Sequence, residues 1–153
     1  MKLAEIIEKN SIIPALKTKD KAGVLEELAQ VISDHVPSIE KEALVKVLVE
    51  RERLGTTGIG DGVAIPHGKL KGIGRPIISF GRSKDGIDFE SIDRQPVYLF
   101  FLLVAPDNSS GIHLQVLAKI ARILKSNTFR KKLMETETRE ELYQTIVQAD
   151  EEH

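Results

Sequence analysis

The residues best suited to chemistry lie in one stretch, Leu54–Leu70, which contains the tripeptide Pro66-His67-Gly68. Pro66 fixes its own φ and holds the preceding residue extended, and Gly68 removes bulk from one side of His67. Repeated glycine permits positive φ and close approach, at a cost in chain entropy. We therefore expect a backbone shaped for a site, with the imidazole displayed at a strand end; the glycines are Gly55, Gly58, Gly60 and Gly62.

Two further side chains are candidates to join His67. Arg51 lies seven residues after Leu44 on the apolar stripe of a predicted helix, so periodicity turns Arg51 inward and Arg53 toward water. A buried arginine needs a partner, which is either a structural carboxylate or an anion delivered to the glycine run. His113 falls in the first turn of another predicted helix, which favours its neutral form. Position alone favours a packed histidine there; the alternative is a hydrogen-bond donor at the site.

Other kinds of site fit the sequence poorly. The glycine run lacks the lysine and hydroxyl that close a Walker loop, and its spacing is not that of a dinucleotide fingerprint. No nucleophile elbow occurs, and Asp61 is either a turn residue or a general base. Cysteine is absent, and only two histidines stand out as metal ligands. We expect neither a cofactor nor a metal.

A nucleophilic histidine with an arginine and a second histidine nearby suits phosphoryl transfer between phosphohistidines. The neutral ring nitrogen of His67 attacks without a separate base. Arg51 supplies forked donors for the moving group, and His113 and main-chain N–H groups supply the rest. ATP and magnesium are not needed when the donor is itself a phosphoprotein. A different class of function also remains open, a binding module whose histidines are only structural.

Composition indicates one globular domain spanning residues 1–153. Apolar residues make up 41% and charged residues 29%, and the formal net charge is −1. A nucleic-acid partner would require a basic surplus, so none is expected. The N-terminus lacks a signal-peptide core, and no apolar run reaches membrane-spanning length. These features predict a cytoplasmic protein without membrane insertion.

Helical and strand patterns alternate along the chain, which predicts an α/β fold with a mixed sheet flanked by helices on its faces. Val97–Val104 is nearly all apolar and is the predicted central strand. A strand is also predicted over 75–82, followed by a turn at 84–86 and a short edge strand over 87–89. A short helix or turn near 3–7 and helices over 21–36, 38–53, 111–125, 129–134 and 139–147 complete the prediction.

Helix ends can be predicted from capping residues. Thr18 or Asp20 is expected to cap the helix that begins at Lys21, and Ser38 the helix that follows. The polar tail at 148–153 is expected to fray.

The segment from Arg51 through Gly68, with His113-Leu-Gln-Val-Leu after the apolar strand, resembles the enzyme IIA domain of the fructose, mannitol and nitrogen-regulatory branches of the bacterial phosphotransferase system. The resemblance spans nearly the whole chain. It implies that His67 takes a phosphoryl group from the phosphocarrier HPr or its nitrogen-branch counterpart. It also implies that Arg51 and His113 assist, and that the fold is a mixed sheet flanked by helices.

Within that family, Thr56-Thr-Gly-Ile-Gly-Asp-Gly62 and Gly68-Lys-Leu are most similar to the nitrogen-regulatory type. That resemblance implies a free-standing regulatory phosphoprotein that binds targets such as potassium-transport or sensor proteins according to its phosphorylation state. The alternative is a sugar-transport component, of the fructose or mannitol kind, that passes phosphate to a IIB protein.

Overall fold

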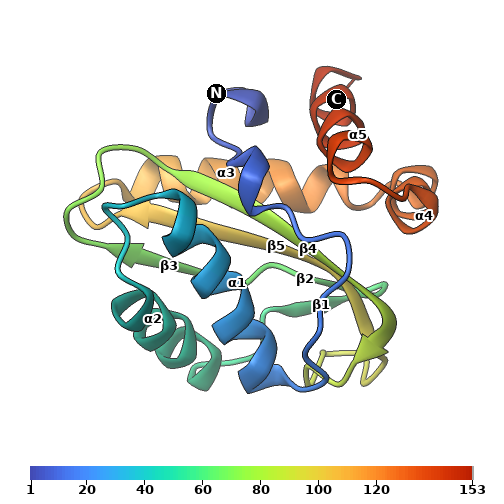
Figure 1. Cartoon of the computed structure of the whole chain (residues 1–153), viewed down its shortest axis with the longest axis horizontal. Coiled ribbons are helices and arrows are strands. Elements are labelled where there is room, and N and C mark those ends of the chain that lie inside the picture. The colour runs from blue at the N-terminus through green and yellow to red at the C-terminus, as the bar shows by residue number, and fades with distance from the viewer. Residues whose placement is uncertain (153) are drawn as a thin grey trace.

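Strand β5 (Val97–Pro106) forms the centre of a mixed sheet in the computed structural model, which describes residues 1–152 (Figure 1). It pairs antiparallel with β4 (Ile77–Ile87) on one side. On the other side it pairs in parallel with two short successive strands, β2 (Val63–Ala64) and β3 (His67–Leu70). A further strand, β1 (Gly58–Gly60), pairs antiparallel with β2. The predicted central strand and the predicted mixed sheet are both confirmed.

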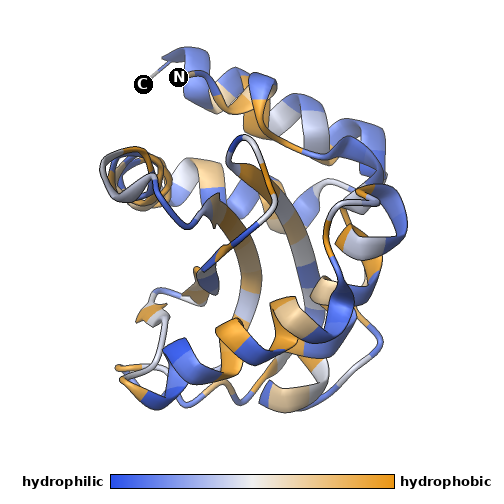
Figure 2. Cartoon of the chain, turned by 90° about the vertical axis from the view of Figure 1, so that its left-hand side faces the viewer, coloured by the Kyte–Doolittle hydropathy of each residue, from blue (hydrophilic) through white to orange (hydrophobic). Residues whose placement is uncertain are grey.

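Alternate side chains of β5 face two separate hydrophobic cores. Leu99, Phe101 and Leu103 pack in the core that is covered by the three C-terminal helices, and Phe100 and Leu102 pack in the core that is covered by α1 and α2. Figure 2 shows hydrophobic residues concentrated on the strands between these helical layers. The bounds are Lys21–His35 for α1, Lys41–Arg53 for α2, Ser110–Ile123 for α3, Asn127–Glu135 for α4 and Arg139–Glu152 for α5.

The helix ends agree with the sequence at some positions and differ at others. Asp20 caps α1, since its Oδ1 accepts a hydrogen bond from the N–H of Gly23 at 2.7 Å. Ser38 does not cap α2, so that prediction is wrong; Glu40 precedes the helix and makes no side-chain cap. Helix α5 extends past its predicted end, through 148–152, while the last tail residue lies outside the described residues. The N-terminal segment forms two 3₁₀ turns, η1 (Leu3–Glu5) and η2 (Lys9–Ser11).

The predicted turn at 84–86 is instead part of a long strand. β4 begins at Ile77 and continues to Ile87, with an irregularity in its pairing to β5 between Arg82 and Ile87. Gly86 has φ of 86° within that irregular stretch. The turn residues therefore produce a bulge in a continuing strand, because one glycine at positive φ lets the chain kink without leaving the sheet.

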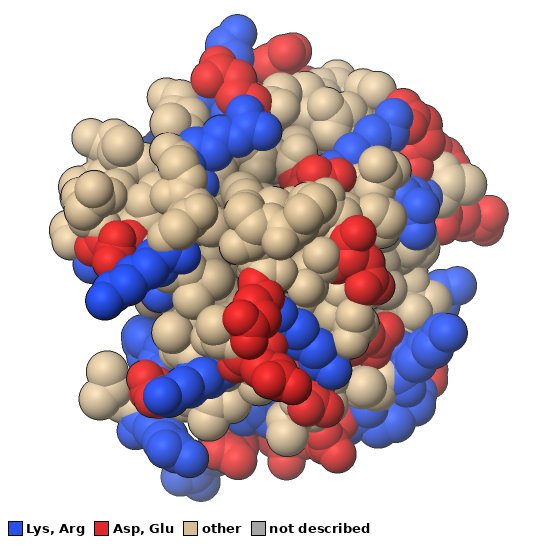
Figure 3. Space-filling view, turned by 60° about the vertical axis from the view of Figure 1, so that its left-hand side comes forward, with Lys and Arg blue, Asp and Glu red and all other residues tan. Residues whose placement is uncertain are grey.

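Charge is distributed without a basic surface on the face seen in Figure 3, where Lys and Arg alternate with Asp and Glu. Among residues 1–152, no helix has both the length and the apolar composition that a membrane span requires.

Arg82 is a buried cation that the sequence did not single out. Only 1% of it is exposed, and it lies on β4 beneath the end of α4. Its guanidinium donates to the carbonyl oxygens of Pro14 (2.9 Å) and Leu133 (2.8 Å), and to that of Thr136. Carbonyls at a helix end have no partner within the helix, so Arg82 joins the end of α4 to the strand and to the N-terminal segment.

We predict that Arg82→Met lowers the free energy of unfolding by at least about 2 kcal/mol, because it leaves buried carbonyl oxygens unpaired. Urea denaturation measures this change. Arg53→Met, at an exposed arginine, is the matched control and should change stability by less than about 0.5 kcal/mol. Equal effects of the two substitutions would contradict the structural role of Arg82.

Candidate phosphoryl-transfer site

His67 begins β3 and is held in one ring orientation by its own backbone. The ring Nδ1 lies 2.8 Å from the carbonyl oxygen of Ile65, which can only accept, so Nδ1 carries the proton and donates. The other nitrogen, Nε2, therefore keeps its lone pair. β3 sits at the edge of the sheet, with His67 opposite Leu103 of β5. The predicted position of His67 at a strand end is confirmed, although its ring is half-buried and not openly displayed.

Arg51 reaches His67 from the last turn of α2. Its Nε–H donates to the Nε2 of His67 at 3.2 Å, and its NH1 group donates to the carbonyl oxygen of Gly55 at 2.8 Å. Arg51 is half-buried and Arg53 is exposed, as helical periodicity predicted. None of the ion pairs found within residues 1–152 includes Arg51, so the structural-carboxylate alternative has no support. The NH1 group of Arg51 therefore anchors the guanidinium to the backbone, while its Nε–H contacts the lone pair on Nε2 of His67.

His113 completes the set from the first turn of α3. Its ring centroid lies 5.2 Å from that of His67, and the two rings are tilted by 58°. Only 6% of His113 is exposed, and its Nδ1 is buried without a hydrogen-bond partner among the described residues. His113 is therefore packed in the interior, as its position in the sequence predicted. It is also adjacent to His67, the candidate nucleophile.

Burial keeps both rings neutral near pH 7. Desolvation lowers the pKa of His67, and the charge of Arg51 lowers it further, while the hydrogen bond to Ile65 acts in the opposite direction. Desolvation lowers the pKa of His113 to about 4, with further contributions from His67 and Lys69. A neutral His67 retains the lone pair on Nε2 that a nucleophile requires.

The two helices that deliver Arg51 and His113 cover opposite faces of the sheet and meet around its edge strand. Gly68 explains how α2 comes so close, because a Cβ at this position would lie 2.8 Å from Cγ2 of Val47. Val47 is one helical turn before Arg51, so the same helix face that packs on Gly68 carries the guanidinium to His67. The absence of a side chain at Gly68 thus sets the spacing between α2 and β3.

These side chains open into a pocket of about 520 Å³. Two of its lining residues are exposed apolar side chains, Leu54 (85% exposed) and Leu114 (64% exposed), and the charged residues Glu50 and Lys69 also line it. Ser110 at the N-terminus of α3 also lines the pocket, and its hydroxyl accepts a hydrogen bond from Lys69 at 2.8 Å. The free N–H groups and positive end of a helix dipole favour an anion at such a position.

The glycine run does not form this pocket, and the expectation that it would is wrong. Gly60, the last residue of β1, and Asp61 and Gly62 in the turn to β2 have positive φ. Gly58 allows close approach to Ser91, whose Cα would lie 2.9 Å from an added Cβ. None of these residues lines the pocket; Gly55 contributes through its carbonyl oxygen alone. Asp61 is therefore a turn residue, because turn geometry and not anion binding requires these glycines.

Sequence reasoning missed Glu52, which holds the end of α2 in place. Its carboxylate accepts from the N–H of Thr57 at 3.0 Å and from the hydroxyl of the same residue, and it pairs with Lys21 at 3.1 Å. It therefore ties α2 to α1 and to the loop that follows Arg51. Glu52 lies one turn after Leu48 and two turns after Leu44, so helical spacing offered a signal for its burial that the sequence analysis did not use. Within residues 1–152, no group of three acidic, histidine or cysteine side chains is arranged to hold a metal.

Comparison with known proteins gives consistent matches over nearly the whole chain. A family described as phosphoenolpyruvate-dependent sugar phosphotransferase system, EIIA 2, matches residues 5–149. A nitrogen regulatory protein of Bradyrhizobium diazoefficiens is 41% identical over 146 residues, which are 95% of each chain. The fructose-specific EIIABC component of Bacillus subtilis is 35% identical over 98% of this chain, which spans only 24% of that protein. The crystal structure of the IIA-Ntr protein of Neisseria meningitidis has a TM-score of 0.87 and 32% identity, covering 94% of this chain and 98% of that one.

We predict that Gly68→Ala destabilises the fold by about 1–3 kcal/mol, because the new methyl group overlaps the stiff β-branched side chain of Val47. Gly74→Ala is the matched control, since a Cβ there would meet no atom within 4 Å. Chemical denaturation compares the two, and adding Val47→Ala to Gly68→Ala should recover part of the loss. If the two glycine variants are equally stable, Gly68 does not set the helix spacing.

We further predict that lowering the pH from 6.5 to about 4 destabilises the protein through His113. The unfolded chain protonates this ring near pH 6.5 while the folded state resists, so stability rises with pH across this window. The loss in the free energy of unfolding between pH 6.5 and pH 4 is on the order of 3 kcal/mol. This loss should be smaller in His113→Gln. NMR titration of the His113 ring gives the direct check, and a midpoint at or above 6.5 would show that the ring is not desolvated as described.

Proposed function

Because the chain belongs to the EIIA 2 family of the phosphoenolpyruvate-dependent sugar phosphotransferase system, we propose that it accepts a phosphoryl group on Nε2 of His67 from a phosphohistidine carrier protein of the HPr type. The observation that carries the proposal is the hydrogen-bond arrangement of the His67 ring. One nitrogen is protonated and bonded to Ile65, and the other is contacted by the guanidinium of Arg51. The chain is accordingly a phosphotransfer component of that system.

The transfer needs no general base. The lone pair on Nε2 of His67 attacks the phosphorus, a new N–P bond forms, and the N–P bond of the donor histidine breaks. The donor ring keeps the electrons of the broken bond and becomes neutral. His67 gains positive charge, which its Nδ1–H shares with the carbonyl oxygen of Ile65. No proton has to leave His67 during the step.

Arg51 has a second role once the phosphoryl group approaches. Its Nε–H now occupies the lone pair of His67, so the guanidinium must turn from the nitrogen to the oxygens of the incoming group. The bond from NH1 to Gly55 keeps the side chain at the site during that movement. The neutral ring of His113 and the N-terminus of α3 provide further donors for the phosphoryl oxygens.

The carrier docks on the exposed apolar side chains in and beside the pocket in this proposal. Leu54 follows α2, while Ile112 and Leu114 flank His113 on α3, so the exposed side chains lie on both sides of the nucleophile. Exposed apolar groups around a polar centre are typical of protein interaction sites. A protein as the phosphoryl donor also explains why the site has a nucleophile and hydrogen-bond donors for the phosphoryl oxygens but no nucleotide-binding loop.

Two branches of the family are compatible with this site, and we propose the nitrogen-regulatory one. The Bradyrhizobium nitrogen regulatory protein matches this chain over 95% of its own length, and the Neisseria IIA-Ntr structure over 98%. On this proposal, the phosphorylation state of His67 controls binding to regulated target proteins. The alternative is a sugar-transport IIA component that passes phosphate to a IIB protein, and the 35% identity to the fructose-specific component favours it.

The function is tested by incubating the protein with phosphorylated carrier and measuring acid-labile phosphate. We expect the wild type to be labelled and His67→Ala to take up none, because the attacking nitrogen is absent. His35→Ala removes an exposed histidine outside the pocket and should be labelled like the wild type. Label retained by His67→Ala would assign the nucleophile elsewhere, and an unlabelled wild type would favour a binding module with structural histidines.

Arg51→Ala should slow phosphoryl transfer about 100- to 1,000-fold, since a preorganised donor at a developing charge contributes about 2.7–4 kcal/mol. The fold should persist, because Arg51 is at the end of its helix and forms no ion pair within residues 1–152. Rapid-quench measurement of the labelling rate checks this, with Arg53→Ala as the control for removing an arginine two positions away. An unchanged rate in Arg51→Ala would remove Arg51 from the mechanism.

A further inference from the structure

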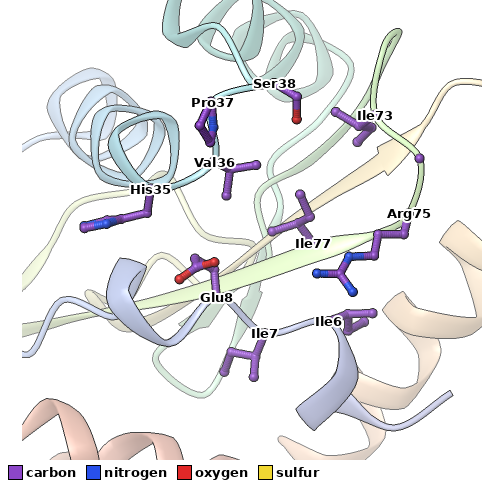
Figure 4. Close-up of a pocket in the computed structure, with 11 residues that line it drawn as sticks. Ile6, Ile7, Glu8, His35, Val36, Pro37, Ser38, Ile73, Arg75 and Ile77 are labelled. Carbon is purple, nitrogen blue, oxygen red and sulfur yellow. The ribbon is translucent and has the colours of Figure 1, made fainter.

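A second pocket, of about 610 Å³, lies away from His67 and shares no lining residue with its site. Three separate segments form it: residues 6–8 near the N-terminus, residues 35–38 at the end of α1, and residues 73–77 leading into β4. Figure 4 shows side chains from these segments facing a common space. Nothing in the proposed phosphotransfer uses this pocket.

Two opposite charges line the pocket without pairing. Arg75 makes no hydrogen bond and no ion pair with any of residues 1–152, and Glu8 makes no ion pair. Among the described residues, the Glu8 carboxylate has one hydrogen bond, a local one in which Oε1 accepts from the N–H of Asn10 at 3.2 Å. In Figure 4 the Glu8 carboxylate and the Arg75 guanidinium extend into the pocket from different sides. They are more than the 4.0 Å of an ion pair apart, so each is free to bind a ligand group of the opposite charge.

The rest of the lining reinforces this polarity. His35 and Val36 bring the C-terminal end of α1 to the pocket, where the negative end of a helix dipole favours a cation. His35 lies on the same side as Glu8 in Figure 4, and Arg75 lies on the other. The pocket wall also includes the buried apolar side chains of Ile6 and Ile77. One end of the pocket therefore suits a cation and the other an anion, and an apolar group can contact the wall beside them.

Access to the pocket is open at the loop that carries Arg75. Gly74 lines the pocket, and a Cβ added there would meet no atom within 4 Å. Gly74 and Arg75 are both exposed, so this end of the pocket is open to solvent.

We propose that this pocket binds a free amino acid, with its carboxylate on Arg75, its ammonium on Glu8 and its side chain against Ile6 and Ile77. A guanidinium matches a carboxylate through two parallel hydrogen bonds, and a carboxylate matches an ammonium. A ligand with negative charge only, such as phosphate, would bring that charge toward Glu8 and the end of α1. The arrangement of charges thus selects a zwitterion over an anion.

The test screens the whole chain by thermal unfolding against each proteinogenic L-amino acid at about 10 mM, a concentration that detects millimolar binding. Isothermal titration then measures the dissociation constant of the amino acid that stabilises most. Arg75→Gln and Glu8→Gln should each weaken it about tenfold or more, since each removes a charged hydrogen-bonding partner. Arg53→Gln, an exposed arginine outside this pocket, should bind like the wild type.

Derivatives of the same amino acid test whether the pocket recognises both its ammonium and its carboxylate. The N-acetyl derivative lacks the ammonium and the amide derivative lacks the carboxylate, so both should bind at least about tenfold more weakly. Inorganic phosphate should not stabilise the protein through Arg75. Phosphorylation of His67 should proceed normally in Arg75→Gln and Glu8→Gln, which separates this proposal from the phosphotransfer function.

The proposal is overturned if no amino acid raises the unfolding temperature, or if the one that does so binds both variants as tightly as the wild type. Loss of binding in only one of the two variants, or equal binding of either derivative, would also contradict recognition of a zwitterion. Stabilisation by phosphate that depends on Arg75 and exceeds that of every amino acid would make the pocket an anion site instead.

Discussion

His67 makes two hydrogen bonds that give its two ring nitrogens different chemistry. The carbonyl oxygen of Ile65 accepts from Nδ1, and this contact places the proton of the neutral ring on that side. Nε2 is then an acceptor, and the Nε–H of Arg51 binds it at 3.2 Å. Every other feature of the site either maintains this pair of contacts or supplies donors around Nε2. The tautomer of one histidine, fixed by its own backbone, is the constraint on which the proposed chemistry depends.

The fold satisfies this constraint by bringing two helical layers together at one sheet edge. A histidine on a central strand would be covered by helices on both faces, and one on a distant loop would lose its backbone partner. In the part of the chain that the structure describes, β3 pairs with β5 alone, so α2 and α3 can approach its other edge from opposite faces. Gly68 permits the close approach of α2, and Glu52 ties the end of that helix to the loop beyond it. These contacts are structural, yet they determine where the guanidinium of Arg51 lies.

Much of this arrangement could be predicted from the sequence because it follows from local patterns. Periodicity turned Arg51 inward and Arg53 outward, a capping residue marked the start of α1, and an apolar run marked β5. The glycine run misled the prediction, because glycine reports unusual backbone geometry without reporting whether a ligand or a turn requires it. Arg82 could not be foreseen, since its partners are carbonyl oxygens of segments brought near only by the tertiary fold. Glu52 binds Thr57 five residues along the chain, but its ion pair with Lys21 depends on how α1 and α2 pack.

The atom that carries the phosphoryl group tests the account most directly. NMR of the phosphorylated protein, with ¹⁵N-labelled histidine, identifies the bonded nitrogen through its coupling to ³¹P. The account predicts coupling to Nε2 of His67, with the proton retained on Nδ1 and its hydrogen bond to Ile65 preserved. Coupling to Nδ1 of His67, or phosphorylation of His113 in its place, would contradict it.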